Sequence, residues 1–291
     1  MKSIILLLTA TTFFSFLGIA QNADSLDITT SIDSTNKAVA DSLKRDGRYY
    51  LGIGSSGIKI SSKTRDSIRE HKTVSIQWGM LDIGVNSLND RSDYGSAAAQ
   101  EYLHVPDANK NSDLFALNQG KSINVNIWPV LMKVKMLNNR NQKISLYTGA
   151  GLQLYNFRFN KDISFLNETK PMLISDSVSF SKNKLAFAYA SIPLMLNFKT
   201  RLGMDNGAWL TYGFGVIGGY NFNSWTKQIS GERGKQKNHD QFNFQQFNLN
   251  LSAEIGIVDY VRFYATYQIT NMYKDALAQY PFAIGLRFCG I

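Results

Sequence analysis

The sequence predicts an all-β fold: a single closed antiparallel transmembrane β-barrel of about eight strands with up-and-down topology. Segments of alternating hydrophobicity recur along residues 73–288, and the connectors between them are by turns short and long. A strand whose every second residue is apolar can face lipid on one side and polar residues on the other. Because hydrocarbon offers backbone N–H and C=O groups no partner, strands cross a membrane only as a closed barrel.

The chain opens with the pattern of an export signal, predicted over residues 1–20. Lys2 supplies the positive start, residues 4–17 are an apolar run, and Gly18 and Ala20 are the small residues that precede the predicted cut before Gln21. The apolar run is too short to cross a bilayer as a helix. We therefore expect export to the cell envelope.

A periplasmic N-terminal extension, partly disordered, is predicted over residues 21–72. Residues 21–46 are rich in Ser, Asp, Thr, Asn and Lys and have few aromatic residues, which is typical of a flexible leader. Further on, residues 49–51 and 57–60 are candidates for a short strand, and 64–71 for one helical turn. A small periplasmic cap and an unstructured tether both remain open.

The barrel is predicted over residues 73–291. Its expected strands are residues 73–86, 123–131, 142–159, 184–200, 207–225, 247–257, 261–269 and 280–288. In the first strand we place Trp78, Met80 and Asp82 on one face, and in the second we place Leu131 on the apolar face. The fifth strand alternates most clearly, with an inward face made of Thr211, Gly213, Gly215, Gly219, Asn221 and Asn223.

The connectors distinguish a barrel from a soluble β-sandwich, which would also alternate. Short connectors are predicted at 137–141, 201–206 and 258–260, long polar ones at 87–119, 160–183 and 226–242, and an intermediate one at 273–279. Short–long alternation gives one tight rim and one elaborated rim, as in outer-membrane barrels with both termini in the periplasm. Eight strands make a barrel just wide enough for side chains to fill.

The composition agrees with a barrel. Hydrophobic residues make up 44% of the chain, and 14 Tyr, 18 Phe and 4 Trp suit the aromatic girdles at the membrane interfaces. Cys289 is the only cysteine, which rules out an intrachain disulfide and a cysteine-based metal cluster. The net charge of +9 comes from Lys and Arg concentrated in connectors and at strand ends. We expect them to meet anionic lipid head groups rather than nucleic acid, and we expect no cofactor.

Several segments resemble the PorT-like outer-membrane β-barrel family. Residues 78–86 (WGMLDIGVN) look like its first strand, and residues 189–196 (YASIPLML) resemble its strand with an aliphatic-Pro-aliphatic pattern. Residues 215–220, 264–267 and 280–286 are similar to its fifth strand and its last two strands. The resemblance covers roughly residues 73–290 and implies an integral outer-membrane protein of a Gram-negative cell. One branch of the family assists protein secretion and gliding, and no catalytic residues carry over.

The chain also departs from the usual ending of such barrels, in which the last residue is an aromatic. Here Phe288 is followed by residues 289–291, Cys-Gly-Ile.

Two groups of charged residues are candidate sites. Glu254, Arg262 and Arg287 point into the lumen if the alternation holds, and Asp82 is a further member. Because an unpaired charge in a narrow lumen is costly, we expect ion pairs. The two readings are a plug that fixes strand register and a charged constriction that admits small ions. The second group is a surface-loop patch made of Lys227, Arg233, Lys235 and Lys237, either a solvated face or a contact for anionic glycolipid.

Three classes of function remain for such a chain. The first is an integral barrel without catalytic activity, acting as an envelope anchor or as an interaction or assembly component, with lipids and other envelope proteins as partners. The second is a small passive pore. The third is an outer-membrane hydrolase, for which the adjacent His239 and Asp240 are the only sequence hint.

Overall fold

The computed structural model describes residues 50–54, 57–61, 73–167, 170–203, 208–257 and 260–289. The predicted signal, the flexible leader and the candidate helical turn at 64–71 lie outside these residues. The chain divides into two units, residues 1–70 and 71–291. In the first unit, β1 (Tyr50–Gly54) and β2 (Gly57–Ser61) pair as an antiparallel hairpin.

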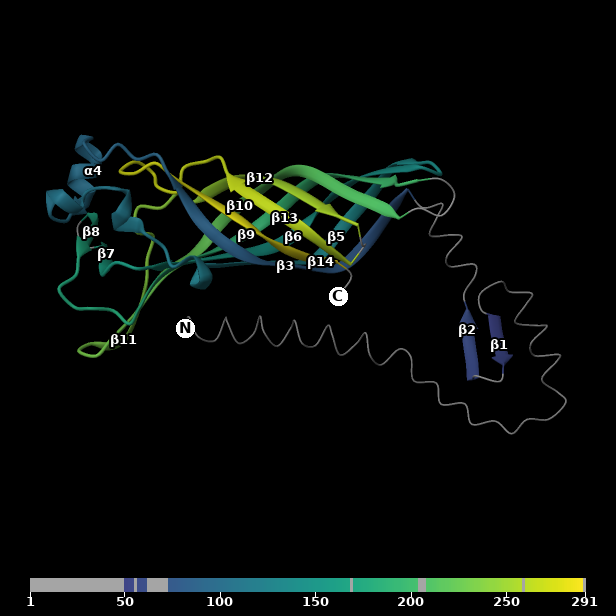
Figure 1. Ribbon diagram of the computed structural model, residues 1–291, viewed down its shortest axis with the longest axis horizontal. Coiled ribbons are helices and arrows are strands. Elements are labelled where there is room, and N and C mark those ends of the chain that lie inside the picture. The colour runs from purple at the N-terminus through teal and green to yellow at the C-terminus, as the bar shows by residue number, and fades with distance from the viewer. Residues whose placement is uncertain are drawn as a thin grey trace. The chain divides into compact units, whose positions relative to one another are not determined.

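Eight long strands of the second unit form one antiparallel ring (Figure 1). They are β3 (Val74–Asp90), β5 (Ile123–Asn138), β6 (Gln142–Phe159), β9 (Lys182–Arg201), β10 (Trp209–Ser230), β12 (Phe247–Gly256), β13 (Val261–Gln268) and β14 (Gln279–Cys289). Each strand pairs with the next along the chain, and β14 pairs with β3 to close the ring. The predicted fold class is therefore confirmed.

The outer face of the ring carries exposed apolar side chains on every strand. One example from each is Ile76, Ile127, Leu152, Ile192, Phe214, Phe247, Phe263 and Ile284. Residues between them on the same strands point inward, since successive side chains of a strand point to opposite faces, and many of them are polar or small. On β12, for example, Asn248, Asn250 and Ser252 are buried. We call the exposed apolar side chains the apolar belt.

The alternation changes phase in β3 at Gly79. This residue has a φ of 65°, a left-handed conformation that favours glycine. As a result Trp78 points outward and is 66% exposed, whereas Asp82 is fully buried and Met80 packs against inward residues. The prediction that put all three side chains on one face was wrong for Trp78.

A second change of phase occurs in β5, in the part of the strand that lies opposite Gly79 of β3. The register between β5 and β6 shifts between Ile127 and Val130. A β-bulge of this kind adds a residue to one strand and reverses the alternation beyond it. Leu131 is consequently 2% exposed and packs beside Trp128 inside the ring, so its predicted place on the apolar outer face was wrong.

A third irregularity lies in β10, where the register with β9 shifts between Asn221 and Asn223. Beyond it the even-numbered residues from Ser224 to Ser230 are buried. Asn223 lies opposite Ala188 on the outer face, contrary to the prediction. The strand then continues through part of the predicted loop 226–242 and turns into β11 (Gly234–His239), which pairs back onto it.

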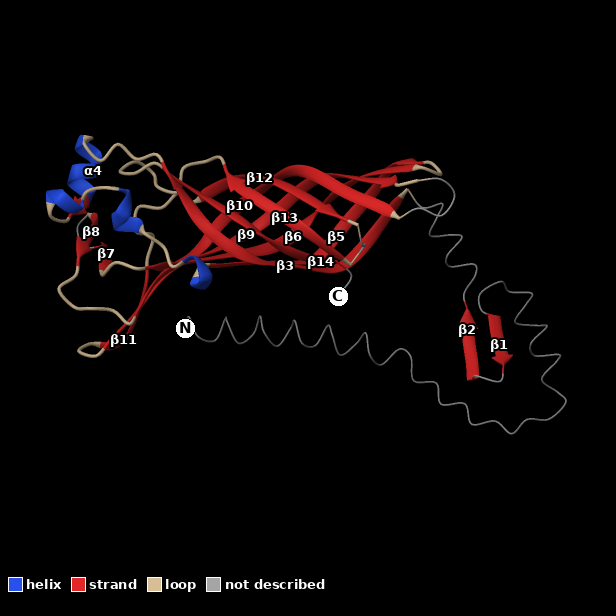
Figure 2. Ribbon diagram, in the orientation of Figure 1, coloured by secondary structure: helices blue, strands red, loops and turns tan. Residues whose placement is uncertain are grey.

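The long connectors gather at one end of the ring, where Figure 2 shows short helices and strands. These include α4 (Ala97–Tyr102) and a three-stranded sheet of β4 (Leu103–His104), β8 (Pro171–Ser175) and β7 (Ile163–Asn167), together with the 3-10 turns Asp107–Asn109, Ser112–Phe115 and Gln119–Lys121. We call the described residues of 91–122, 160–181, 240–246 and 269–278 the cap, and this end the loop-side rim. No helix among the described residues is long and apolar enough to span a membrane.

Candidate functional site

Four buried charged side chains meet inside the ring. They come from neighbouring strands: Asp82 from β3, Glu254 from β12, Arg262 from β13 and Arg287 from β14. Arg287 lies directly opposite both Asp82 and Arg262 in the strand register, so the closure of the ring brings them to one level. We call these four residues the lumen cluster.

Arg287 is the centre of the lumen cluster. Its Nε and Nη2 donate to the two carboxylate oxygens of Asp82 at 2.7 and 2.8 Å, a bidentate pair. Its Nη1 donates to Glu254 Oε2 at 2.7 Å, and Arg262 Nη1 donates to Glu254 Oε1 at 2.9 Å. Two guanidinium groups therefore face two carboxylates, and the charges balance.

Neutral side chains complete the hydrogen bonds of the two carboxylates. Asn126 Nδ2 and Trp128 Nε1 donate to Asp82 Oδ2 at 3.1 and 3.0 Å, and Asn197 Nδ2 donates to Glu254 Oε1. The alternation pattern did not indicate that Asn126, Trp128 and Asn197 would contact these charges. The strand register makes these contacts: Asn126 lies directly opposite Asp82, and Asn197 and Glu254 lie on either side of Gly213.

An apolar cluster fills the lumen next to these charges. It consists of Trp128, Leu131 and Ile217, with Met80 packed against it. Gly151 makes room for the indole, because a Cβ at this position would lie 2.4 Å from Trp128 Cε3. The cavity that remains between the cluster and the charges has a volume of about 20 Å³, which is space for roughly one water molecule.

The loop-side half of the lumen is filled by aromatic side chains. Inward residues of β6 and β9, such as Phe157 and Phe187, are continuous with a core in the cap that includes Phe165, Phe244 and Tyr273. Phe187 and Phe244 meet edge to face, with ring centroids 4.7 Å apart. The cap is therefore a packed layer with its own apolar core rather than a set of separate loops.

Tyrosine hydroxyls within the cap are removed from water. Tyr102 and Tyr273 are 4% and 0% exposed, and their rings meet edge to face at 5.6 Å. Burial raises the pKa of both hydroxyls above the usual value, so both stay protonated and neutral. They act here as packed aromatic groups rather than as acids.

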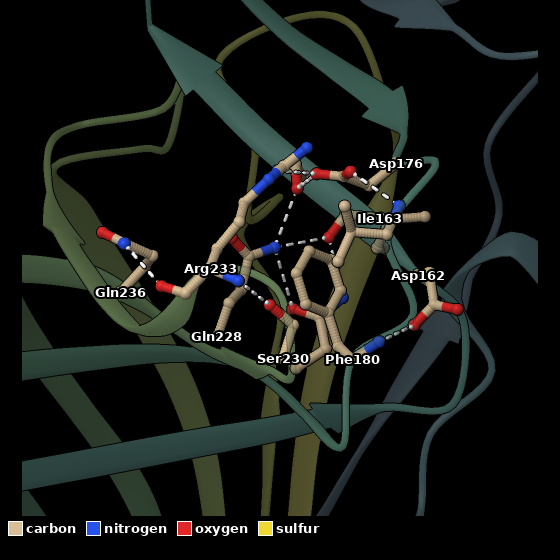
Figure 3. Close-up of polar contacts among 11 residues, drawn as sticks. Asp162, Ile163, Asp176, Phe180, Gln228, Ser230, Arg233 and Gln236 are labelled. Atoms are coloured by element: carbon tan, nitrogen blue, oxygen red, sulfur yellow. Dashed lines mark hydrogen bonds and ion pairs between the residues drawn. The ribbon is translucent and has the colours of Figure 1, made fainter.

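A polar network joins the cap to the hairpin formed by β10 and β11 (Figure 3). Gln228 of β10 donates through Nε2 to Ile163 O and Ser164 Oγ, at 3.0 and 2.8 Å. Arg233, in the turn between β10 and β11, donates through Nη1 to Asp176 Oδ2 at 2.9 Å. These contacts hold the β10–β11 hairpin against the connector between β6 and β9.

Asp176 is the anchor of this network. Its side chain is 5% exposed and accepts hydrogen bonds from Ser164 Oγ and from the backbone N–H of Val178. Burial alone would raise the pKa of Asp176, but these two hydrogen bonds and the Arg233 guanidinium hold it below its usual value. The carboxylate is therefore ionised at neutral pH.

The predicted surface-loop patch is divided by the structure. Lys227, Lys235 and Lys237 lie on the outer face of the β10–β11 hairpin. Arg233 does not join them, because its guanidinium turns to Asp176. The Arg233 side chain is still 48% exposed, but its charge is paired with a buried carboxylate from a different connector, which was not visible in the sequence.

The side chains of His239 and Asp240 each contact other groups. His239 Nδ1 lies 2.9 Å from Asn223 Oδ1, and the imidazole stacks on Trp225. Asp240 Oδ1 accepts from the backbone N–H of Gln241 instead. Burial and the nearby Lys237 charge lower the pKa of His239. Within the described residues, no group of three His, Cys, Asp or Glu side chains is placed to hold a metal ion.

No family model matches the chain, and no curated protein matches it. Among solved structures, the chain is similar to the crystal structure of Ail, the attachment invasion locus protein of Yersinia pestis. The identity is 8%, the match covers 73% of this chain and 98% of that chain, and the TM-score is 0.25. A likeness at that score supports no conclusion about this protein.

Proposed function

We propose that the protein is an integral outer-membrane β-barrel without catalytic activity, acting as an envelope anchor or as an interaction or assembly component through its cap. The apolar belt around a closed ring carries this proposal. Trp78, Phe247 and Phe263 are 66%, 67% and 68% exposed on the outer face. A belt of this extent is a liability in water but is the expected surface of a barrel in lipid.

The filled lumen favours an anchor over a passive pore. A pore needs a continuous aqueous path. This lumen instead contains the lumen cluster, whose two positive and two negative charges balance, together with an apolar cluster and a packed aromatic layer. The charge-balanced hydrogen bonds of Arg287 also favour the register-fixing plug over an ion-admitting constriction. Ion pairs of this geometry would have to break before an ion could pass.

The cap supplies the surface for interaction. Its apolar core and the Asp176–Arg233 pair hold four connectors together, so it presents a preorganised surface that loses little entropy on binding. Outer-membrane lipids and other envelope proteins are the partners we propose. An association with protein secretion rests only on the resemblance to PorT-like barrels and stays a prediction.

Membrane insertion is tested by fractionation and gel migration. The expected result is recovery of the processed chain in the detergent-soluble outer-membrane fraction, with a migration that changes on boiling because a folded barrel resists detergent unfolding. Recovery in the soluble periplasm, without detergent, would contradict the proposal.

The lack of a pore and the role of the cap need separate measurements. In planar bilayers we expect no conductance steps above those of a heat-denatured control, and steady channels would favour the pore. For the cap, affinity purification from the native envelope is compared with a variant whose residues 160–181 are replaced by a short turn. A partner retained by the intact chain and lost by the variant supports the interaction role; identical recoveries argue against it.

A further inference from the structure

Four cationic side chains form a line across four strands just beyond the apolar belt. In the strand register Arg158 of β6 lies opposite Lys184 of β9, Lys184 lies opposite Lys227 of β10, and Lys227 lies opposite Lys237 of β11. Directly opposite residues share a face and have Cβ atoms about 5 Å apart. Four strands therefore place these cations along a line about 14 Å long. We call these four residues the cationic row.

Two more lysines flank the cationic row on the same face. Ile229 of β10 lies opposite both Lys182 of β9 and Lys235 of β11. In the part of the chain that the structure describes, none of these five lysines forms an ion pair with a carboxylate. Like charges placed directly opposite each other destabilise a sheet. These neighbouring like charges therefore lower the stability of the fold unless an anion lies against them.

The bulge in β10 decides the side on which the row lies. Before the register shift at Asn221 the odd-numbered residues of β10 point inward, and after it they point outward. Lys227 therefore faces away from the lumen, on the same face as Trp225. The ammonium of Lys237 lies 5.2 Å from the centroid of the Trp225 ring.

In a membrane that surrounds the apolar belt, the cationic row lies at the level of the head groups. On β10 the exposed Phe222 of the apolar belt is followed by Trp225 and then by Lys227. Trp and Tyr are enriched at membrane–water interfaces. Lys227 lies about 7 Å beyond Trp225 along the strand, or about 5 Å along the normal of a membrane crossed at 45°. The head-group layer is roughly 5–8 Å thick.

We propose that the cationic row binds phosphate groups on glycolipid head groups of the leaflet beside the loop-side rim. Phosphate is the matching ligand because it is compact, carries up to two charges and offers several acceptor oxygens to ammonium and guanidinium donors. Neighbouring positions of the row allow one glycolipid molecule with two phosphates to contact two cations. This inference rests on the proposed membrane location.

The test uses the full chain folded into phosphatidylcholine bilayers with increasing amounts of a bis-phosphorylated glycolipid. The readout is the temperature at which the heat-modifiable band is lost, since a ligand that binds only the folded state raises it. The variant is Lys184→Gln/Lys227→Gln/Lys237→Gln. The matched control, Lys121→Gln/Lys161→Gln/Lys274→Gln, removes the same charge from exposed positions of the cap.

We expect the glycolipid to stabilise the wild type and the control. It should bind the row variant on the order of 100-fold more weakly, because each of the three removed lysines contributes about 1 kcal/mol near an anionic surface. The dephosphorylated glycolipid should stabilise none of them. An equal response of wild type and row variant would overturn the proposal. Equal stabilisation by dissolved inorganic phosphate would overturn the assignment to a head group.

The outcome in phosphatidylcholine alone separates this inference from the proposed function. A chain that does not insert there, and shows no heat-modifiable band, contradicts the membrane location itself. A chain that inserts normally but ignores the phosphorylated glycolipid contradicts only the role of the cationic row.

Discussion

Replacing Arg287 is the most direct test of how the lumen is held together. Arg287→Met removes a side chain that is 2% exposed and donates three hydrogen bonds to Asp82 and Glu254. It leaves two buried carboxylates with only Arg262 as a cationic partner. Removing one partner of a buried ion pair costs about 3–5 kcal/mol. We expect the free energy of unfolding to fall by that amount.

A double variant separates lost charge balance from lost packing. Asp82→Asn/Arg287→Met leaves one carboxylate and one guanidinium, and the new amide oxygen still accepts from Asn126 and Trp128. The two changes together should therefore cost less than the sum of the single changes. The expected coupling is at least about 1.5 kcal/mol, the lower end for close charge pairs.

The assay is reversible urea unfolding in phospholipid vesicles, followed by tryptophan fluorescence, for the wild type, both single variants and the double variant. The reasoning is refuted if Arg287→Met unfolds at the same urea concentration as the wild type. It is also refuted if the effects of the two single substitutions simply add, because the residues would then not act as a charge-balanced pair.

Three further predictions follow from particular contacts. Gly151→Leu should lower the unfolding free energy in the same assay by about 1–3 kcal/mol through overpacking, whereas Gly218→Leu, where a Cβ meets no atom within 4 Å, should be nearly neutral. The Val178 amide donates to the Asp176 carboxylate, so its protection from hydrogen exchange should fall when that carboxylate is protonated. Because the pKa of Asp176 is lowered, this loss should occur below about pH 3.9, the ordinary pKa of an aspartate, and Asp176→Asn should show no such step. The Cys289 thiol, 6% exposed and inward, should react with a thiol reagent only after unfolding, and prompt labelling of the folded chain would show an open lumen at this level.

The sequence alone was enough to predict the barrel. Alternation over eight segments gives a sheet with one apolar face and one polar face. In a membrane, every backbone N–H and C=O group of that sheet must be hydrogen-bonded, which requires the sheet to close into a ring. The strand bounds are recovered closely where no bulge intervenes, as in β6, predicted and observed at residues 142–159. The inward placement of Glu254, Arg262 and Arg287 followed from the same alternation.

The tertiary structure decided where the alternation changes phase and which inward side chains touch. One positive φ at Gly79 and one register shift at Asn221 reverse the direction of Trp78 and Lys227, and no residue count from the sequence reveals an inserted residue. Arg287 meets Asp82 because the last strand pairs with the first, 205 residues apart in the sequence. The core of the cap was not predicted at all, because its connectors have no periodic pattern and bury their aromatic residues only against one another and the rim.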